Sequence, residues 1–139
     1  MKILLSIKPE FADKILSGEK RYEYRKALHK HPNVRSALVY VTQPVGKLVC
    51  EFDISAIVKL APAEMWEKTA AWSGISKEFF DSYFENRRYA FALKIGAVKK
   101  YDVPRDPYDV FEDFVPPQSF RYVSQSAFPK QGSLFPELI

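Results

Sequence analysis

Three side chains that could do chemistry stand within six consecutive positions of the chain. Lys20, Glu23 and Arg25 offer a mobile ammonium, a carboxylate and a planar fork of donors. Together they could hold an anionic or planar polar ligand, with Glu23 accepting a proton from a base amino group or an attacking water. Crowding by Arg21 and Arg25 would lower the pKa of Lys20. The segment therefore predicts a ligand site in which Lys20 and Glu23 are catalytic if the protein is an enzyme.

The same residues also have a purely structural interpretation. Residues 19–26 alternate like a strand, which would point Lys20 to one face and Glu23 and Arg25 to the other. The charges would then form a solvated strand face with an ion pair of little energetic value. All three side chains converge only if the strand is irregular just after Gly18.

Other polar residues add one candidate and remove several classes of site. Lys8 stands where an apolar strand ends and a helix begins, a place that suits an anion or a solvated lysine equally. His29 and His31 lack a third ligand nearby, so we expect no metal site. The chain has no nucleophile-elbow serine motif, no phosphate-binding glycine loop and no paired-cysteine motif, and we expect no cofactor.

Hydrophobic patterning predicts a chain made mostly of strands. One helix, from Pro9 to the capping Gly18, separates the first two strands. A pair of short helices, opened by Pro62 and Ser76, separates the fourth and fifth. The expected strands are residues 2–8, 19–26, 34–42, 47–58, 89–101 and 119–123. We therefore expect an α+β fold, a small, mixed, partly open β-barrel with flanking short helices.

Composition limits the partners and the compartment. The 139 residues fit one domain, and a net charge of +4 suits a nucleotide or a short single strand better than a long duplex. The aromatic share of 15% can build a core or stack on bases. The lone Cys50 excludes an intramolecular disulfide and reads as a small buried residue. No segment is long and apolar enough for a signal peptide or a membrane span, so we expect a cytoplasmic protein without a membrane partner.

Three motifs give the chain a resemblance to a known family. The patterns are L-x-S-I-K-P at 4–9, I-L-S-G-x-K-x-x-E-x-R at 15–25 and P-P-Q-S-F-R-Y-V at 116–123. They resemble the ASCH domain, a member of the PUA-like superfamily, over roughly residues 2–123, nearly the whole of the expected domain at 1–123. The resemblance implies a barrel with a cleft lined by the second strand, to which the closing region returns. It thus adds Ser119 and Tyr122 to Lys8, Lys20, Glu23 and Arg25 as expected ligand-binding residues.

The resemblance leaves several functions open. Family members are mostly expected RNA binders or regulators, which makes RNA or a modified nucleoside the expected partner. Some small members resemble amidohydrolases that remove the acyl group of N4-acetylcytidine, and another branch is similar to ribonucleases. In the amidohydrolase branch the motif lysine is catalytic and a threonine follows three residues later. Lys20 matches that lysine, but Glu23 replaces the threonine, and Glu78 and Glu85 are candidates for the further catalytic glutamate by location only.

The final residues carry a separate motif. Residues 124–139 are expected to form a tail, either docked or flexible, after the domain. Within it, Gln131, Leu134 and Phe135 resemble the short peptide by which bacterial proteins bind the replication sliding clamp. The alternative is that Leu134 and Phe135 cap the barrel. An adaptor function through this tail is therefore a third hypothesis.

Overall fold

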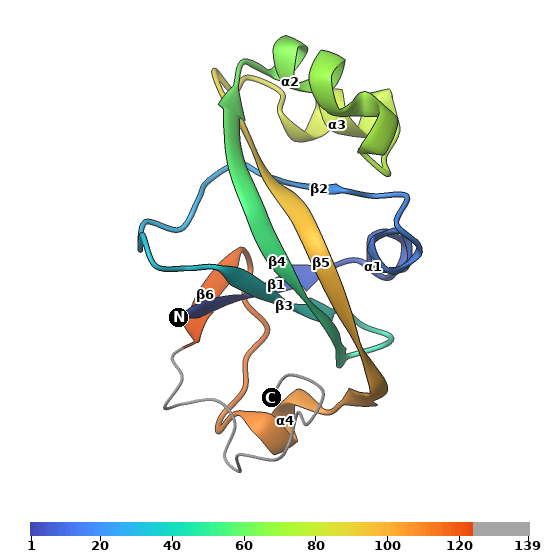
Figure 1. Ribbon diagram of the computed structural model, residues 1–139, viewed down its shortest axis with the longest axis vertical. Helices are drawn as coiled ribbons and strands as arrows, with labels where there is room; N and C mark the ends of the chain where they lie inside the picture. The colour runs from blue at the N-terminus through green and yellow to red at the C-terminus, as the bar shows by residue number, and fades with distance from the viewer. Residues whose placement is uncertain (124–139) are drawn as a thin grey trace.

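A single curved sheet forms the body of the protein in the computed structural model, which describes residues 1–123 (Figure 1). The strands are β1 (Lys2–Ile7), β2 (Tyr22–Arg25), β3 (Ser36–Val41), β4 (Lys47–Leu60), β5 (Ala90–Arg105) and β6 (Phe120–Val123). Their order is β2-β5-β4-β3-β1-β6, and only β1 and β3 pair in parallel. The long strands β4 and β5 cross the shorter β1 and β3 steeply. The expected mixed, partly open barrel is confirmed.

Short helices surround the sheet, with α2 and α3 at one end, α4 at the other and α1 beside the middle (Figure 1). They are α1 (Pro9–Ser17), α2 (Pro62–Thr69), the 3-10 turn η1 (Ala70–Trp72), α3 (Lys77–Tyr83) and α4 (Pro107–Val110). Gly18 ends α1 at φ 87°, and the Ser76 hydroxyl caps α3 by accepting from the Phe79 N–H. The sequence did not predict α4, because four residues are too few to show a hydrophobic period. Asp106 caps this last helix through the Tyr108 N–H.

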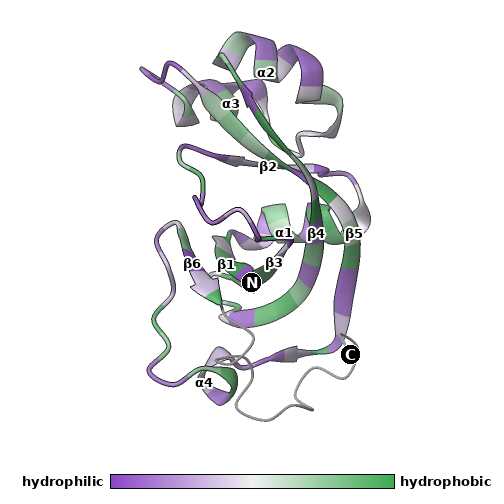
Figure 2. Cartoon of the chain, turned by 60° about the vertical axis from the view of Figure 1, so that its left-hand side comes forward, coloured by the Kyte–Doolittle hydropathy of each residue, from purple (hydrophilic) through white to green (hydrophobic). Residues whose placement is uncertain are grey.

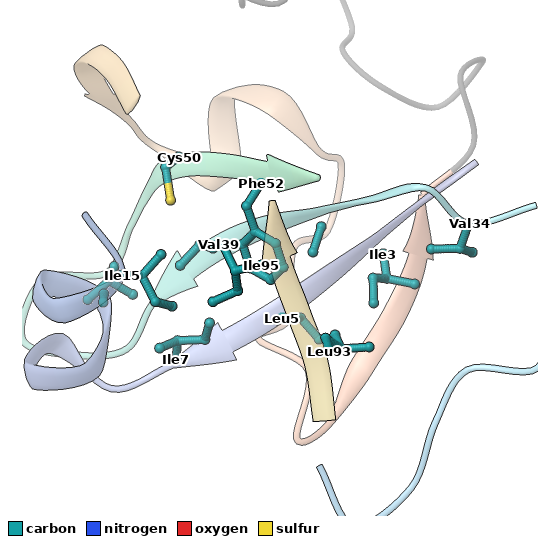
Figure 3. Packing of buried hydrophobic residues seen from close by; sticks show 13 residues of the cluster. Ile3, Leu5, Ile7, Ile15, Val34, Val39, Cys50, Phe52, Leu93 and Ile95 are labelled. Carbon is teal, nitrogen blue, oxygen red and sulfur yellow. The ribbon is translucent and has the colours of Figure 1, made fainter. Parts of the chain in front are cut away.

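The main core lies inside the curl of the sheet (Figure 3). Ile3, Leu5 and Ile7 of β1 pack there against Val39 of β3 and Phe52 of β4. Every residue of β3 is buried, because a second cluster around Leu38 and Tyr40 covers the other face of this central strand. Burial on both faces explains why β3 reads as a continuous apolar run. Cys50 is buried and unpaired, as expected.

A third apolar cluster fixes α2 and α3 to the end of the sheet where β5 begins. Tyr24 of β2 packs against Met65, Phe80 and Phe84 of these helices. Its hydroxyl lies 2.6 Å from the Thr69 Oγ1, which donates to the Met65 carbonyl at 2.7 Å. Figure 2 shows the hydrophobic half of β5 beside α2 and α3, and a hydrophilic half beyond it. The cluster holds α3 beside β2, and this placement creates the site described below.

Within residues 1–123, no helix has the length and apolar character needed to cross a membrane.

Candidate functional site

A cavity of about 240 Å³ lies where α1, β2, α3 and the end of β1 meet. We call it the cleft. Its polar lining includes Lys8, Lys20, Glu23, Arg25 and Gln118. The rings of Phe11, Tyr24, Phe79 and Tyr83 also line it. The cleft thus combines charged groups with aromatic walls, a lining that suits a planar polar ligand.

Lys20 reaches the cleft because it stands outside the strand. The regular β2 ladder begins only at Tyr22, so the expected strand over 19–26 starts too early. The N–H of Lys20 donates to the Lys14 carbonyl at 3.0 Å, and the N–H of Arg21 donates to the Trp72 carbonyl at 2.8 Å. Strand alternation therefore does not apply to Lys20. This irregularity after Gly18 brings Lys20 into one cavity with Glu23 and Arg25.

The Lys20 side chain is almost fully buried, with 2% of its surface exposed. Its Nζ donates to the Ser73 carbonyl at 2.7 Å and lies 4.8 Å from the centre of the Tyr24 ring. Burial lowers the pKa of Lys20 from 10.5 to about 8; Glu23 opposes this shift, and Arg25 adds to it. Near neutral pH a fraction of Lys20 is therefore an uncharged amine, the form that can accept a proton.

Glu23 and Arg25 form an ion pair beside Lys20. The Arg25 Nη2 lies 3.1 Å from the Glu23 Oε2, and each residue is 8% exposed. Arg25 also donates from Nη1 to the Ser119 carbonyl at 3.2 Å and from Nη2 to the Ser6 carbonyl at 3.4 Å. Its buried Nε finds no hydrogen-bond partner within residues 1–123. Arg25 thus connects β2 to the end of β1 and to the segment before β6, and it keeps one donor unused.

The other expected ligand-binding residues divide between the cleft and its surroundings. Lys8 is exposed at the cleft, with its Nζ 5.4 Å from the Phe79 ring centre. Ser119 contributes only the carbonyl that Arg25 contacts. Tyr122 does not line the cleft. Its hydroxyl instead accepts hydrogen bonds from the backbone N–H groups of Lys30 and His31, at 2.8 and 3.1 Å. A ligand-binding role for Tyr122 stays a prediction.

Comparison with known proteins decides the family. A family model described as the ASCH domain matches residues 5–99. The chain belongs to the ASCH domain family. The match to the family model confirms the resemblance, and the matched range includes the strand that carries Glu23 and Arg25.

Relatives of this ASCH domain occur in proteins of different sizes. An ATP synthase subunit alpha of Ureaplasma parvum is 37% identical over 106 residues, covering 75% of this chain but 13% of that protein. The chain thus spans only a small part of that relative. An ASCH domain-containing ribonuclease of Zymomonas mobilis is 26% identical over 137 residues, covering 94% of this chain and 90% of the relative. The crystal structure of ASCH from Zymomonas mobilis superposes with a TM-score of 0.83 at 25% identity, covering 91% and 90% of the two chains.

Several lining residues of the ASCH cleft were not among the expected site residues, and they include Phe11, Phe79, Tyr83 and Gln118. Phe79 and Tyr83 read as one apolar stripe with Phe80 and Phe84 in the sequence. Helical geometry divides this stripe into two i, i+4 pairs: Phe80 and Phe84 enter the core, while Phe79 and Tyr83 stack at 6.3 Å and face the cleft. The i, i+4 spacing of Phe79 and Tyr83 was the sequence signal that could have identified them as a separate aromatic face.

Several other expectations lie away from the cleft. Glu78 and Glu85 are exposed, and neither lines the cleft. A catalytic role for either glutamate stays a prediction. No group of three metal-ligating side chains occurs within residues 1–123. Gln131, Leu134 and Phe135 lie outside the described residues, and the partner-binding tail and the boundary at residue 123 stay predictions.

Proposed function

We propose that this ASCH domain binds single-stranded RNA, with one nucleobase, standard or modified, held in the cleft. One observation carries the proposal: Lys20, Glu23 and Arg25 share a cavity whose walls are aromatic rings. Rings on two different helices, Phe11 and Phe79, offer stacking surfaces that accept any base. The named function of the Zymomonas mobilis relative, a ribonuclease, supports RNA as the class of ligand.

The polar groups are suited to the edge of a base and its phosphate. Glu23 keeps one carboxylate oxygen outside its contact with Arg25, and that oxygen can accept from a base amino group. Lys20 has donor hydrogens beyond the one that the Ser73 carbonyl accepts, and the Nη1 of Arg25 has one beyond its contact with Ser119. These groups can donate to a base carbonyl or a phosphate oxygen. A base inside a duplex cannot enter such a cavity, so the ligand must present an unstacked base. The domain should therefore prefer single strands to duplexes.

Cleavage of the bound RNA is the second candidate function, favoured by the state of Lys20. Its lowered pKa, about 8, supplies an amine that can take the proton from a ribose 2′-hydroxyl as that oxygen attacks the adjacent phosphorus. The bond from phosphorus to the 5′-oxygen then breaks, and the ammonium of Lys20 returns the proton to the leaving oxygen. Arg25 would neutralise charge on the phosphate. The same amine could instead activate water against an acyl-amide on a base, as in the amidohydrolase branch.

Fluorescence anisotropy with a labelled 12-nucleotide RNA of mixed sequence tests the binding proposal. We expect the single strand to bind more tightly than a duplex of the same sequence. Arg25→Ala and Lys20→Ala should each weaken binding by roughly tenfold or more, the loss of one or two charge-assisted contacts. The control is Lys77→Ala, an exposed lysine of α3 outside the cleft whose ion pair with Asp81 is solvated. If the unmodified protein binds neither this RNA nor a panel of nucleosides at low salt, the proposal fails.

Product analysis separates the two reactions from binding alone. The protein is incubated with the same RNA and, separately, with N4-acetylcytidine, beside the Lys20→Ala variant. RNA fragments that depend on Lys20 would establish cleavage, and free cytidine that depends on Lys20 would establish deacylation. Binding without either product would leave a binding module and refute the catalytic candidate.

A further inference from the structure

A group of exposed cations stands beside the cleft without carboxylate partners. We call it the basic rim: Lys26, Lys59, Arg87 and Arg88, together with the ring of Tyr89. Within residues 1–123, none of these four cations forms an ion pair. Three of them lie instead over aromatic rings: Lys59 is 4.4 Å and Arg88 is 5.5 Å from the Tyr89 ring centre, and Lys26 is 4.7 Å from that of Tyr83.

The turn between α3 and β5 presents the two arginines. Asn86 adopts φ 62°, a left-handed conformation that asparagine tolerates, and the Arg87 N–H donates to the Phe84 carbonyl at 3.0 Å. This turn leaves Arg87 and Arg88 exposed at the start of β5, and Tyr89 is 40% exposed. Figure 1 shows β4 ending and β5 beginning beside α2 and α3. The rim therefore collects Lys59 of β4, Lys26 directly after β2, and the residues that lead into β5, all at the same end of the sheet.

The basic rim is continuous with the cleft. Tyr83 lines the cleft on one side and carries Lys26 over its ring. Across the sheet, Arg25 of β2 stands opposite Phe91 of β5, which stands opposite Lys59 of β4. Residues opposite one another share a face, so Arg25 and Lys59 lie on one face about 10 Å apart, two strand spacings. A ligand that begins at Arg25 would meet Lys59 next along this row.

This geometry matches an extended chain of phosphates with exposed bases. Cations along such a row can neutralise successive phosphates, and a half-exposed ring such as Tyr89 offers a stacking surface. The same turn carries one acidic residue, Glu85, against the two arginines Arg87 and Arg88, so its charge stays positive. We propose that an RNA strand with one base in the cleft continues over the basic rim, with phosphates on Lys59, Arg87 and Arg88 and a flanking base on Tyr89. This inference rests on the proposed function and names the path of the strand.

The test compares two double variants that remove the same charge. The first is Lys59→Gln with Arg88→Gln in the rim. The control is Lys99→Gln with Lys100→Gln, two exposed residues of β5 roughly 25 Å along the strand from Phe91. Affinity for the labelled 12-nucleotide RNA is measured from 50 to 300 mM salt. In parallel, binding of the four nucleoside monophosphates is followed by protein NMR shifts.

The rim variant should bind the 12-nucleotide RNA about tenfold more weakly at the lowest salt. The slope of log affinity against log salt should fall by about 1.4, since each phosphate contact on a single strand contributes about 0.7. The NMR shifts of the rim variant on binding the nucleoside monophosphates should equal those of the unmodified protein. The control should keep both affinity and slope. Tyr89→Ala should lower affinity at every salt concentration without changing the slope.

Two outcomes would overturn the inference while leaving the proposed function intact. One is a rim variant that binds the RNA as tightly as the unmodified protein, which would show that the strand does not cross the rim. The other is an equal loss in rim and control variants, which would indicate general attraction without a path. If the unmodified protein binds neither oligonucleotide nor mononucleotide, the proposed function itself fails.

Discussion

Gly74 leaves just enough room for the side chain of Lys20. A Cβ atom at position 74 would lie 2.6 Å from the Lys20 Cβ and 2.9 Å from its Cγ. Gly74 also has φ 67°, a conformation that side chains rarely adopt. The same connection between η1 and α3 supplies the Ser73 carbonyl to the Lys20 Nζ. The buried lysine therefore depends on a glycine far away in the sequence.

Gly74→Ala should displace Lys20. We expect a loss of about 1–3 kcal/mol in the free energy of unfolding, and a pKa of Lys20 closer to 10.5 as the side chain gains water. Denaturant unfolding and NMR of the lysine side chain measure the two effects. Gly46→Ala is the control, because Gly46 has φ 61° but the atoms nearest to an added Cβ belong to the far end of the flexible Gln43 side chain. A Gly74→Ala protein whose Lys20 pKa stays near 8 would show that this connection does not hold Lys20 in place.

Lys20→Met should stabilise the fold at pH 7. The folded pKa of Lys20, about 8, lies below its usual 10.5, so burial of the charged form is unfavourable below pH 8. This penalty is relieved as pH rises from 8 towards 10.5, because the folded state loses its proton first. One pKa unit corresponds to about 1.4 kcal/mol. Lys20→Met also loses the hydrogen bond to the Ser73 carbonyl, which offsets part of the gain from removing this penalty. We therefore expect the free energy of unfolding to rise by about 1–2 kcal/mol at pH 7.

That gain should shrink between pH 8 and 9.5. Measurements should stop there, because Tyr24, whose pKa is raised to about 12 chiefly by burial, begins to oppose folding once unfolded tyrosine ionises near pH 10. Unfolding in urea of both proteins at pH 7, 8, 9 and 9.5 supplies the comparison. A Lys20→Met protein less stable than its parent at pH 7 would contradict the description of Lys20 as an unfavourably buried cation.

Glu23→Gln and Arg25→Gln should move the pKa of Lys20 in opposite directions. Glu23 raises this pKa and Arg25 lowers it, so the first substitution should take it below about 8 and the second above. Each variant also leaves a buried charge without its partner, which should destabilise the fold by about 3–5 kcal/mol. NMR titration of the Lys20 side chain measures the shifts, and equal shifts in one direction would refute the arrangement of charges.

Thr69 and Tyr24 link α2 to β2 beneath the cleft. Because Thr69 donates to the Met65 carbonyl, the Tyr24 hydroxyl donates to Thr69. Tyr24→Phe should lower the free energy of unfolding by about 1 kcal/mol, the net value of one buried hydrogen bond. Thermal unfolding measures the change. Tyr22→Phe, which removes a hydroxyl with no hydrogen-bond partner among residues 1–123, should have little effect, and equal losses in both variants would contradict this account.

The sequence predicted the strands and most helices because their local signals agree with the tertiary structure. Pro9, Gly18 and Ser76 mark helix ends through their own backbone preferences, which packing does not override. The position of Lys20 was different. Strand alternation extended the β2 pattern back to residue 19. In the structure the Arg21 carbonyl still accepts from the Ile95 N–H of β5, but the Arg21 N–H donates to the Trp72 carbonyl, and the Lys20 N–H donates to the Lys14 carbonyl. A contact between residues so far apart leaves no trace in local periodicity.

The aromatic walls of the cleft were hidden for a similar reason. Phe79 and Phe80 are neighbours of the same type, and only the packing of α3 against Tyr24 decides which one enters the core. Charged residues in a short run, in contrast, were visible as a candidate site from their types alone. The charged residues of the cleft were thus predictable from the sequence, whereas Gln118 and the aromatic walls required the fold.

The contact between RNA and the cleft can be observed directly by NMR. Intermolecular NOEs would be sought between base protons of the 12-nucleotide RNA and ring protons of Phe11, Phe79 and Tyr83. We predict NOEs from one base to at least two of these rings, and their loss in Arg25→Ala, with the fold verified by the core methyl signals. RNA that binds without any contact to these rings, or that keeps them unchanged in Arg25→Ala, would contradict the assignment of the cleft as the nucleobase site.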